Sequence, residues 1–475
     1  MVNNVRTNYL TGAEALVRLL DAHEVKYIFG LCGDTTLPFY DALYRLNHSI
    51  KHILTRDERS ASYMADGYAR VTGKVGICEG PSGGGATYII PGVVEANESS
   101  ISVIAITSDV PTSSIGHFPL TELNQKELFK PLTKWNEKID NAKNLGKLVR
   151  KSFEESTSGR PGACHLCFPF DIQKAEVAEE DIWVNKEFSK FPALPKAPDP
   201  SKVDQIIKEI MKSKKPMIIC GGAIKNSFAE KELQKLVEKT NIVLATSVTG
   251  KGTLADTHPN CLGVVGSNGG SIHTREITKN SDLIIFIGCR AGSVTTEKWQ
   301  YPNKKTKIIS SVGFNSRELF FLRKREKITN GKDFLLVGGM GHTAMTALSM
   351  TKYTKSQVIC MDGDGSFIMH MGSLSILNNF NSPNFKYILI DNEAHESIGL
   401  QPISINKVDF KKLSKSLGFK NFYLINSKNE IKKNITKLLN NKGPSFMHVK
   451  IKTGTLENLP RPKDFISIKR NFMIN

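Results

Sequence analysis

Two polar side chains in the last third of the sequence stand where apolar runs end, and their chemical types suit a metal-bound phosphate. Asp364 lies between Gly363 and Gly365, directly after the run QVICM. Asn392 follows the next apolar run, YILI. Glycine lets the backbone approach a ligand closely, and Mg²⁺ takes oxygen ligands from protein groups and phosphates. The pattern predicts a cation held by Asp364 and Asn392, with the backbone carbonyl of Ala394 as a further ligand.

Apolar runs of strand length recur along the chain and alternate with helix-like segments. They are KYIFGLCG, GKVGICEG, ISVIAITS, KPMIICGG, NIVLATSV, DLIIFIG, SQVICMDG and KYILIDN. Each run ends in a Gly, Asp, Asn or Ser turn, which is typical of parallel α/β sheets with helices on both faces. Ligands bind at the carboxyl ends of such strands, where the sequence places Asp364 and Asn392.

The length of 475 residues is too great for one core and predicts several domains. The stretch PALPKAPDPSKV is rich in proline and lysine, as interdomain linkers often are. A second boundary is expected near WQYPNKKTK. The sequence therefore predicts three doubly wound parallel-sheet domains, over residues 1–185, 203–305 and 306–475, with a linker at 186–202.

Composition limits the expected partners. The net charge is +18, yet no dense basic stretch contains interleaved aromatic residues, so nucleic-acid binding is not expected. The run DLIIFIGC is too short to span a membrane, and the N-terminus lacks a basic-then-apolar signal pattern. Eight scattered cysteines indicate reduced thiols and a cytoplasmic location. The pair in CHLC is expected to lie in a buried strand rather than to bind zinc.

The G-D-G…N pattern resembles the diphosphate and metal motif of thiamine-diphosphate enzymes. The resemblance implies that Asp364, Asn392 and the carbonyl of Ala394 hold Mg²⁺. It also implies that the diphosphate lies against the residues of the G-D-G-S turn, Gly363, Asp364, Gly365 and Ser366. Many members carry a second Asn where this chain has Asp391, and strand alternation predicts that the Asp391 side chain points away from the site.

The N-terminal third resembles the large subunit of acetolactate synthase, in TGAEALVRLLDAHEVKYIFGLCGDTTLPFYDAL and in TRDERSASYMADGYARVTGKVGICEGPSGGG. The most specific feature is the Glu before a helix ending in ADGYAR, which is Glu58 here. The resemblance implies that Glu58 hydrogen-bonds the aminopyrimidine ring and that Pro81 contacts the cofactor. Without the flanking match, Glu58 could equally be a carboxylate favoured by a helix N-terminus.

The segment GGMGHTAMTALS supplies further cofactor contacts in the same resemblance. Gly339, Met340 and His342 are expected at the cofactor, with Met340 as the apolar support that bends it. Three histidines are predicted to donate protons or to bind an anionic substrate, whereas His370 is expected only to pack. These three are His342, His395 and His117.

The last third resembles phosphonopyruvate and sulfopyruvate decarboxylases, in KDFLLVGGMGHTAMTALS, DGDGSFIMHMGSLSIL and NEAHESIGLQP. The middle segment resembles the central domain of acetolactate synthase, but it is shortened. The predicted strand TKIISSV would have to serve as the first strand of the last domain, so the central sheet would lack a closing strand and have an exposed edge. In acetolactate synthases this region also helps to hold FAD. Arg290 matches their sequence, but the residues that usually follow this arginine are absent here, so FAD is not predicted. Thr121 stands where the synthases have a pocket-lining glutamine.

These likenesses predict an enzyme dependent on thiamine diphosphate and Mg²⁺ that decarboxylates a short, anionic 2-oxoacid such as phosphonopyruvate or sulfopyruvate. The resemblance implies that a thiazolium ylid adds to the keto carbon and that protonation of the resulting enamine releases an aldehyde. Attack on a second carbonyl would make the chain an acetolactate-synthase-like carboligase, and an impaired relative is a third alternative. A homodimer or homotetramer with shared active sites is also implied.

Overall fold

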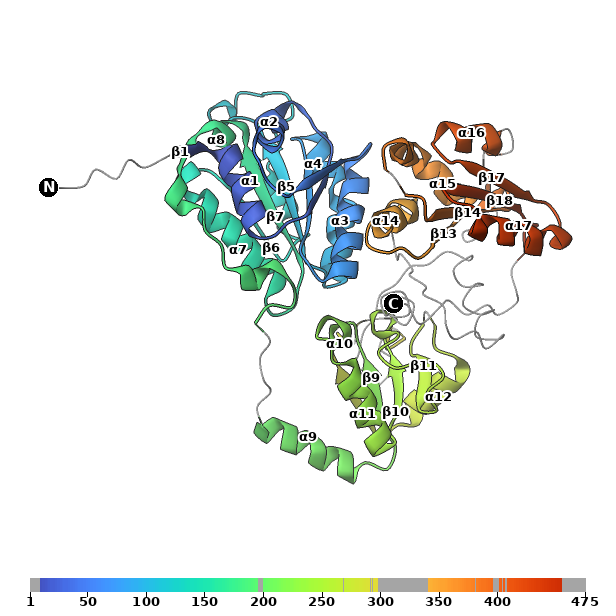
Figure 1. Cartoon of the computed structure of the whole chain (residues 1–475). Helices are drawn as coiled ribbons and strands as arrows, with labels where there is room; N and C mark the ends of the chain where they lie inside the picture. The colour runs from blue at the N-terminus through green and yellow to red at the C-terminus, as the bar shows by residue number, and fades with distance from the viewer. Residues whose placement is uncertain are drawn as a thin grey trace.

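The computed structural model describes residues 9–194, 200–267, 269–290, 292, 294–297, 341–380, 382–395, 401–403, 405 and 408–454. Three parallel sheets follow one another along this part of the chain, each flanked by helices (Figure 1). The prediction of an α/β chain with three parallel sheets is confirmed. The predicted strand TKIISSV and the predicted boundary near 305 lie outside the described residues, and the domain limits stay predictions.

The first sheet has six strands, all paired in parallel in the order β3-β2-β4-β5-β7-β6. They are β2 (Tyr27–Gly30), β3 (Lys51–Leu54), β4 (Gly76–Gly80), β5 (Val103–Asp109), β6 (Trp135–Lys138) and β7 (Ala163–Pro169). An antiparallel pair beside it joins β1 (Tyr9–Thr11) to β8 (Glu176–Ala178). The helices are α1 (Gly12–Ala22), α2 (Leu37–Arg45), α3 (Glu58–Thr72), α4 (Gly84–Tyr88), α5 (Ile90–Glu98), α6 (Gln125–Phe129), α7 (Leu145–Thr157) and α8 (Phe170–Lys174).

Helices cover both faces of this sheet because its strands are apolar on both sides. Ile77 of β4 packs into a core formed with α1, α2 and α7. The next residue, Cys78, belongs to the opposite core, with Met64 of α3 and Val93 of α5. The CHLC pair lies in β7, where Cys164 and Cys167 are buried free thiols, as predicted.

The central sheet has four described strands in the order β11-β10-β9-β12, again all parallel. They are β9 (Pro216–Cys220), β10 (Val243–Thr246), β11 (Cys261–Val264) and β12 (Leu283–Ile287). Its helices are α9 (Pro200–Lys212), α10 (Ala223–Asn226), α11 (Glu230–Thr240) and α12 (Ile272–Asn280). Within the described residues β12 is an edge strand, and its five residues are only half-buried.

The third sheet is parallel in the order β13-β14-β18-β17. Its strands are β13 (Val358–Gly363), β14 (Phe385–Asp391), β17 (Asn421–Ile425) and β18 (Ser445–Lys450). A short antiparallel pair joins β15 (Ala394–His395) to β16 (Gln401–Pro402). The helices are α14 (Thr343–Met350), α15 (Asp364–His370), α16 (Phe410–Ser416) and α17 (Lys428–Asn440). No helix in the described ranges is long and apolar enough to cross a membrane.

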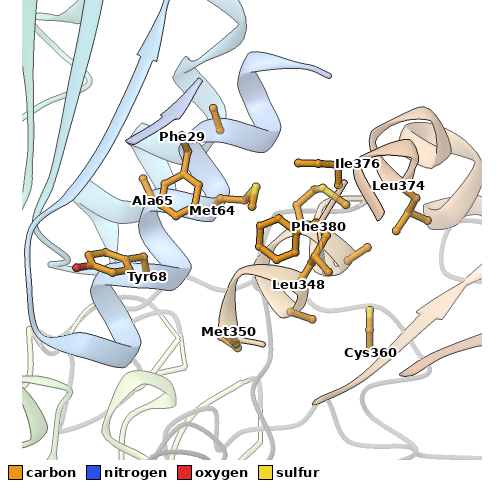
Figure 2. Close-up of a cluster of buried hydrophobic side chains, with 14 of the residues drawn as sticks. Phe29, Met64, Ala65, Tyr68, Leu348, Met350, Cys360, Leu374, Ile376 and Phe380 are labelled. Atoms are coloured by element: carbon orange, nitrogen blue, oxygen red, sulfur yellow. The ribbon is translucent and has the colours of Figure 1, made fainter. Parts of the chain in front are cut away.

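The first and third sheets share one hydrophobic core, because α3 packs directly on α14. Figure 2 shows Met64 of α3 pointing toward Phe380 of the third part of the chain. The helices approach closely at Gly67, where a Cβ atom would lie 2.8 Å from the Ser349 hydroxyl. Nearer the N-terminal end of α3, the Ser60 hydroxyl donates to the Ser373 hydroxyl at 2.9 Å, so this end of the helix also lies against the third part of the chain. Figure 1 shows α3 beside α14.

Candidate active site

The ends of β13 and β14 bring Asp364 and Asn392 together. The two strands pair in parallel up to Gly363 and Ile390, so the residues that follow them emerge at one edge of the sheet. Asp364 begins α15, and its carboxylate Oδ2 accepts hydrogen bonds from the backbone N–H groups of Asn392 at 3.0 Å and Glu393 at 2.7 Å. The predicted metal ligands Asp364 and Asn392 are thus neighbours, although the sequence separates them by a whole strand–helix step.

The donor set at this edge fits Mg²⁺. It combines the Asp364 carboxylate with the Asn392 amide, whose Oδ1 lies 3.3 Å from the Ala394 nitrogen. These are hard oxygen ligands of the kind that Mg²⁺ prefers. At Gly365 an added Cβ would lie 3.9 Å from Ile403, its nearest contact outside the adjacent residues, so the turn beside Asp364 is not crowded.

Asp391 does not point away from this edge, and that expectation is wrong. Its carboxyl hydrogen-bonds the Asp364 carboxyl, and its Oδ2 lies 2.6 Å from Nε2 of His448 on β18. Burial, together with the neighbouring Asp391 carboxyl, raises the pKa of Asp364 to about 6. Strand alternation fails as a guide here because Asp391 is the last residue of β14, where the chain turns.

The turn before α14 is joined to the turn at Asp364. The backbone N–H of Gly341 donates to the Ser366 hydroxyl at 2.8 Å, and Ser366 is buried. Gly339 and Met340, which were predicted to contact the cofactor, lie outside the described residues. Gly341 itself therefore lies against the G-D-G-S turn.

Glu58 is the first residue of α3, and Asp57 caps that helix by accepting a hydrogen bond from the Arg59 backbone. The glycines of the β4–α4 loop leave room for its side chain, because a Cβ on Gly85 would lie 3.1 Å from Glu58 Oε1. The same Cβ would lie 2.5 Å from Pro81, so the Glu58 carboxyl and Pro81 meet at the start of α4, and their contacts with the cofactor stay predictions. Burial raises the pKa of Glu58.

His342 lies between the first and third parts of the chain. Its ring stacks on Tyr63 of α3, with centroids 4.6 Å apart, and lies 4.0 Å from the ring of His370. Its Nδ1 is buried without a hydrogen-bond partner among the described residues. Burial lowers the pKa of His342 to about 3, so the ring is neutral and can act as a hydrogen-bond partner rather than as a cation.

His370, which was expected only to pack, does pack its ring against that of His342 near the start of α3, in a tilted arrangement. Sequence reasoning also passed over Glu79, a carboxylate in the apolar run GICEG whose position inside a strand was a usable signal.

The remaining predicted residues make no described contact with Glu58 or Asp364. His117 is exposed on the loop before α6, and His395 lies in β15. Thr121 bonds the Ser82 hydroxyl at 2.7 Å.

Arg290 does not stand free at the end of the central sheet. Its guanidinium donates to the backbone carbonyl of Glu98 and lies 3.4 Å from the Glu98 carboxylate. Because Glu98 ends α5, this contact ties the central part of the chain to the first part.

Comparison with known protein families gives three successive matches. Residues 10–128 match the thiamine pyrophosphate enzyme N-terminal TPP binding domain, and residues 203–319 match the central domain. Residues 312–449 match the C-terminal TPP binding domain of the same enzymes.

Similar curated proteins include acetolactate synthase subunits. The chain is 39% identical over 285 residues to a probable acetolactate synthase large subunit of Methanococcus aeolicus, a match that covers 59% of the chain and 47% of the relative. It is 38% identical over 301 residues to the corresponding protein of Methanocaldococcus jannaschii, covering 63% and 50%. The large subunit of Corynebacterium glutamicum is 32% identical over 281 residues, covering 59% and 44%.

The chain spans about half the length of these relatives. The three family matches, however, fall in order on the three parallel sheets, and the first and third matches contain Glu58 and Asp364 respectively. The chain therefore belongs to the thiamine pyrophosphate enzymes, and its chemistry depends on thiamine diphosphate with Mg²⁺.

Proposed function

We propose that this enzyme is a carboligase that decarboxylates one 2-oxoacid and joins the remaining fragment to a second 2-oxoacid. The observation that carries the cofactor chemistry is the buried Glu58 carboxyl at the start of α3, two residues before Ser60, whose hydroxyl bonds Ser373 of the third part of the chain. The similar acetolactate synthase subunits favour ligation over the simple decarboxylation that the C-terminal segments suggest.

The residues of the third part would anchor the cofactor. Asp364, Asn392 and the carbonyl of Ala394 would hold Mg²⁺, and the metal would hold the diphosphate at the start of α15, because a helix N-terminus favours anions. Thiamine diphosphate supplies an electron sink for the pair of electrons that departing carbon dioxide leaves behind.

Glu58 would control a proton at the other end of the cofactor. A carboxyl group with a raised pKa can hold its proton close to neutral pH, donate it to a ring nitrogen and take it back. The position of Glu58 at the start of a helix, against the glycine loop after β4, fixes where that proton is offered.

Decarboxylation without ligation is the second candidate, and one observation favours it. The neutral imidazole of His342 adjoins Asp57 and Arg59 at the start of α3, and it could relay a proton to the product carbon by taking one up at one ring nitrogen as it gives one up from the other. A histidine that protonates this carbon would end the reaction at an aldehyde before a second 2-oxoacid adds.

Product analysis separates the candidates. The full chain, with thiamine diphosphate and Mg²⁺, is offered pyruvate, phosphonopyruvate or sulfopyruvate, and carbon dioxide and carbonyl products are identified. Acetolactate from pyruvate supports the carboligase, whereas an aldehyde from an anionic 2-oxoacid supports the decarboxylase. Poor binding of thiamine diphosphate, with no product from any of the three, contradicts both and favours the impaired relative.

The homodimer or homotetramer and the cytoplasmic location belong to this proposal as well. Within one chain α3 already packs on α14, so a site shared between subunits would need the same two surfaces to meet across a dimer. Light scattering of the purified chain, with and without cofactor, measures the assembly directly.

A further inference from the structure

Glu79 is a buried carboxylate that the cofactor chemistry described above does not use. It lies in β4 with 1% of its surface exposed, inside a strand whose other residues are Gly76, Ile77, Cys78 and Gly80. A lone carboxylate in such a place is costly unless hydrogen bonds or a proton compensate it. Its presence therefore calls for a specific set of partners.

Two side chains are hydrogen-bond partners of the Glu79 carboxylate, and both contact the same oxygen, Oε1. The Tyr40 hydroxyl donates to Glu79 Oε1, and Nε2 of His52 lies 3.4 Å from the same atom. Tyr40 and His52 also bond each other, at 2.9 Å. The second oxygen, Oε2, is buried and has no hydrogen-bond partner among the residues that the structure describes.

The backbone is shaped to accept this carboxylate. At Gly30 on the neighbouring strand β2, a Cβ atom would lie 1.8 Å from Glu79 Oε1, so no other residue type fits there without displacing the carboxylate. The following residue, Gly80, faces the opposite side of the sheet, where its Cβ would lie 3.3 Å from Glu58 Cγ. Glu79 therefore lies behind Glu58, on the other side of one strand.

We propose that Glu79, held by Tyr40 and His52, is a positioning residue that sets the protonation of Glu58. The inference rests on the proposed role of Glu58 in proton transfer. An exposed glutamate titrates near pH 4.3, too low to retain a proton at neutral pH. A second negative charge nearby favours the protonated form, and the charge of Glu79 is among the causes that raise the pKa of Glu58.

Other charged and titratable groups surround Glu58 and Glu79, and some raise the pKa values of these carboxyls while others lower them. Around Glu58 they are Asp57, whose charge acts with Glu79, and Arg59, whose charge opposes it. Around Glu79 they are Tyr40, His52, Cys32 and Cys78. Burial raises the pKa of Glu79 overall, and among the described residues Tyr40 and His52, which donate to its carboxylate, oppose that rise by favouring the ionised form.

The test titrates the full chain without cofactor or substrate by infrared spectroscopy, from about pH 4 to about pH 9. Subtracting the spectrum of the E58Q variant isolates the carboxyl band of Glu58, and the same subtraction is made in an E79Q background. We expect E79Q to lower the Glu58 midpoint by about one pH unit, the size of a like-charge effect between nearby carboxylates.

Two further variants keep the test decisive. Tyr40→Phe removes a donor that stabilises ionised Glu79, so the Glu58 midpoint should fall in the same direction by a smaller amount; this variant decides the matter if E79Q does not fold. Glu137→Gln, on strand β6 of the same sheet, should leave it unchanged. A Glu58 midpoint that stays constant in folded E79Q, or in Tyr40→Phe, overturns the proposal.

The infrared titration needs no catalysis, so its outcome is independent of the product analysis. A shifted midpoint in a chain that makes no acetolactate would leave the carboxylate pair standing and remove the carboligase. Acetolactate formation with an unchanged Glu58 midpoint would support the carboligase and overturn the proposed effect of Glu79 on Glu58.

Discussion

Glu58 carries the most direct prediction at the scale of single residues. Glu58→Gln keeps the shape and the hydrogen-bonding capacity of the side chain but removes its exchangeable carboxyl proton. Turnover should fall by at least about 100-fold, a usual contribution of acid–base catalysis, while thiamine diphosphate still binds. Steady-state kinetics and a fluorescence titration of the cofactor measure the two effects. Near-normal turnover would remove Glu58 from the mechanism.

Asp364 should govern metal-dependent cofactor binding. Asp364→Ala removes the only carboxylate predicted to hold Mg²⁺, so calorimetry should show that Mg²⁺ no longer strengthens cofactor binding. Glu393→Gln is the matched control, because Glu393 is exposed and its backbone, not its side chain, bonds Asp364. An unchanged Mg²⁺ dependence in Asp364→Ala would show that the metal is bound elsewhere.

Part of this site could be predicted from residue types and spacing alone. Asp364 and Asn392 follow two apolar runs, and strands that run in parallel must deliver both to one edge. The contact between Asp391 and His448 could not be predicted in that way, because it depends on which strand lies beside β14. Likewise, Glu79 was visible as a charge in an apolar run, but its partners come from α2 and β3.

At the scale of elements, the packing of α3 on α14 can be tested through one glycine. Gly67 has Ser349 at 2.8 Å and Thr346 at 3.2 Å from the position of a Cβ. Gly67→Leu should push the helices apart and destabilise the chain by about 1–3 kcal/mol, as overpacking does, and cofactor affinity should fall with it. Thermal unfolding and a cofactor titration measure both effects.

Gly372→Ala is the control, because nothing lies within 4 Å of a Cβ at that position and the residue is exposed. It should leave both the unfolding temperature and the cofactor affinity unchanged. If Gly67→Leu behaves like this control, α3 and α14 do not pack together in solution.

Most strands of the three sheets were readable from the sequence, since each is a short apolar run ending in a turn residue. The sequence analysis did not predict β3, β6, β11, β17 and β18, and β6, with the sequence WNEK, has no apolar run. The antiparallel pairs β1–β8 and β15–β16 were not, because each is only two or three residues long and carries too little pattern. The packing of α3 on α14 also could not be predicted from the sequence. It needs small residues on both helices at matching heights, and no local pattern reveals that match.

For the molecule as a whole, buried histidines predict sensitivity to acid. Burial lowers the pKa values of His23, His165 and His342 to about 3, whereas an unfolded chain binds these protons near pH 6.5. The stability they contribute is complete above that pH and is lost as the pH falls toward 3. Each one should cost about 1.4 kcal/mol per pH unit within this window.

His342→Phe keeps an aromatic ring in the stack and cannot take up a proton. The decline of the unfolding temperature with falling pH should therefore be shallower in this variant, by the equivalent of one proton. His117→Gln, at an exposed position, should follow the parent chain. Parallel curves for His342→Phe and the parent would show that His342 is not held neutral.

The order of the domains has a consequence for how the protein is made. The apolar face of α3, with Met64 and Tyr68, is covered by residues from near Leu348 to Phe380, and the whole central sheet lies between them in the chain. During synthesis at about 5–20 residues per second, the ribosome releases the first domain long before its covering surface exists. A nascent chain halted after the first domain would expose this face, and chaperones that bind apolar surface should associate with it until α14 emerges.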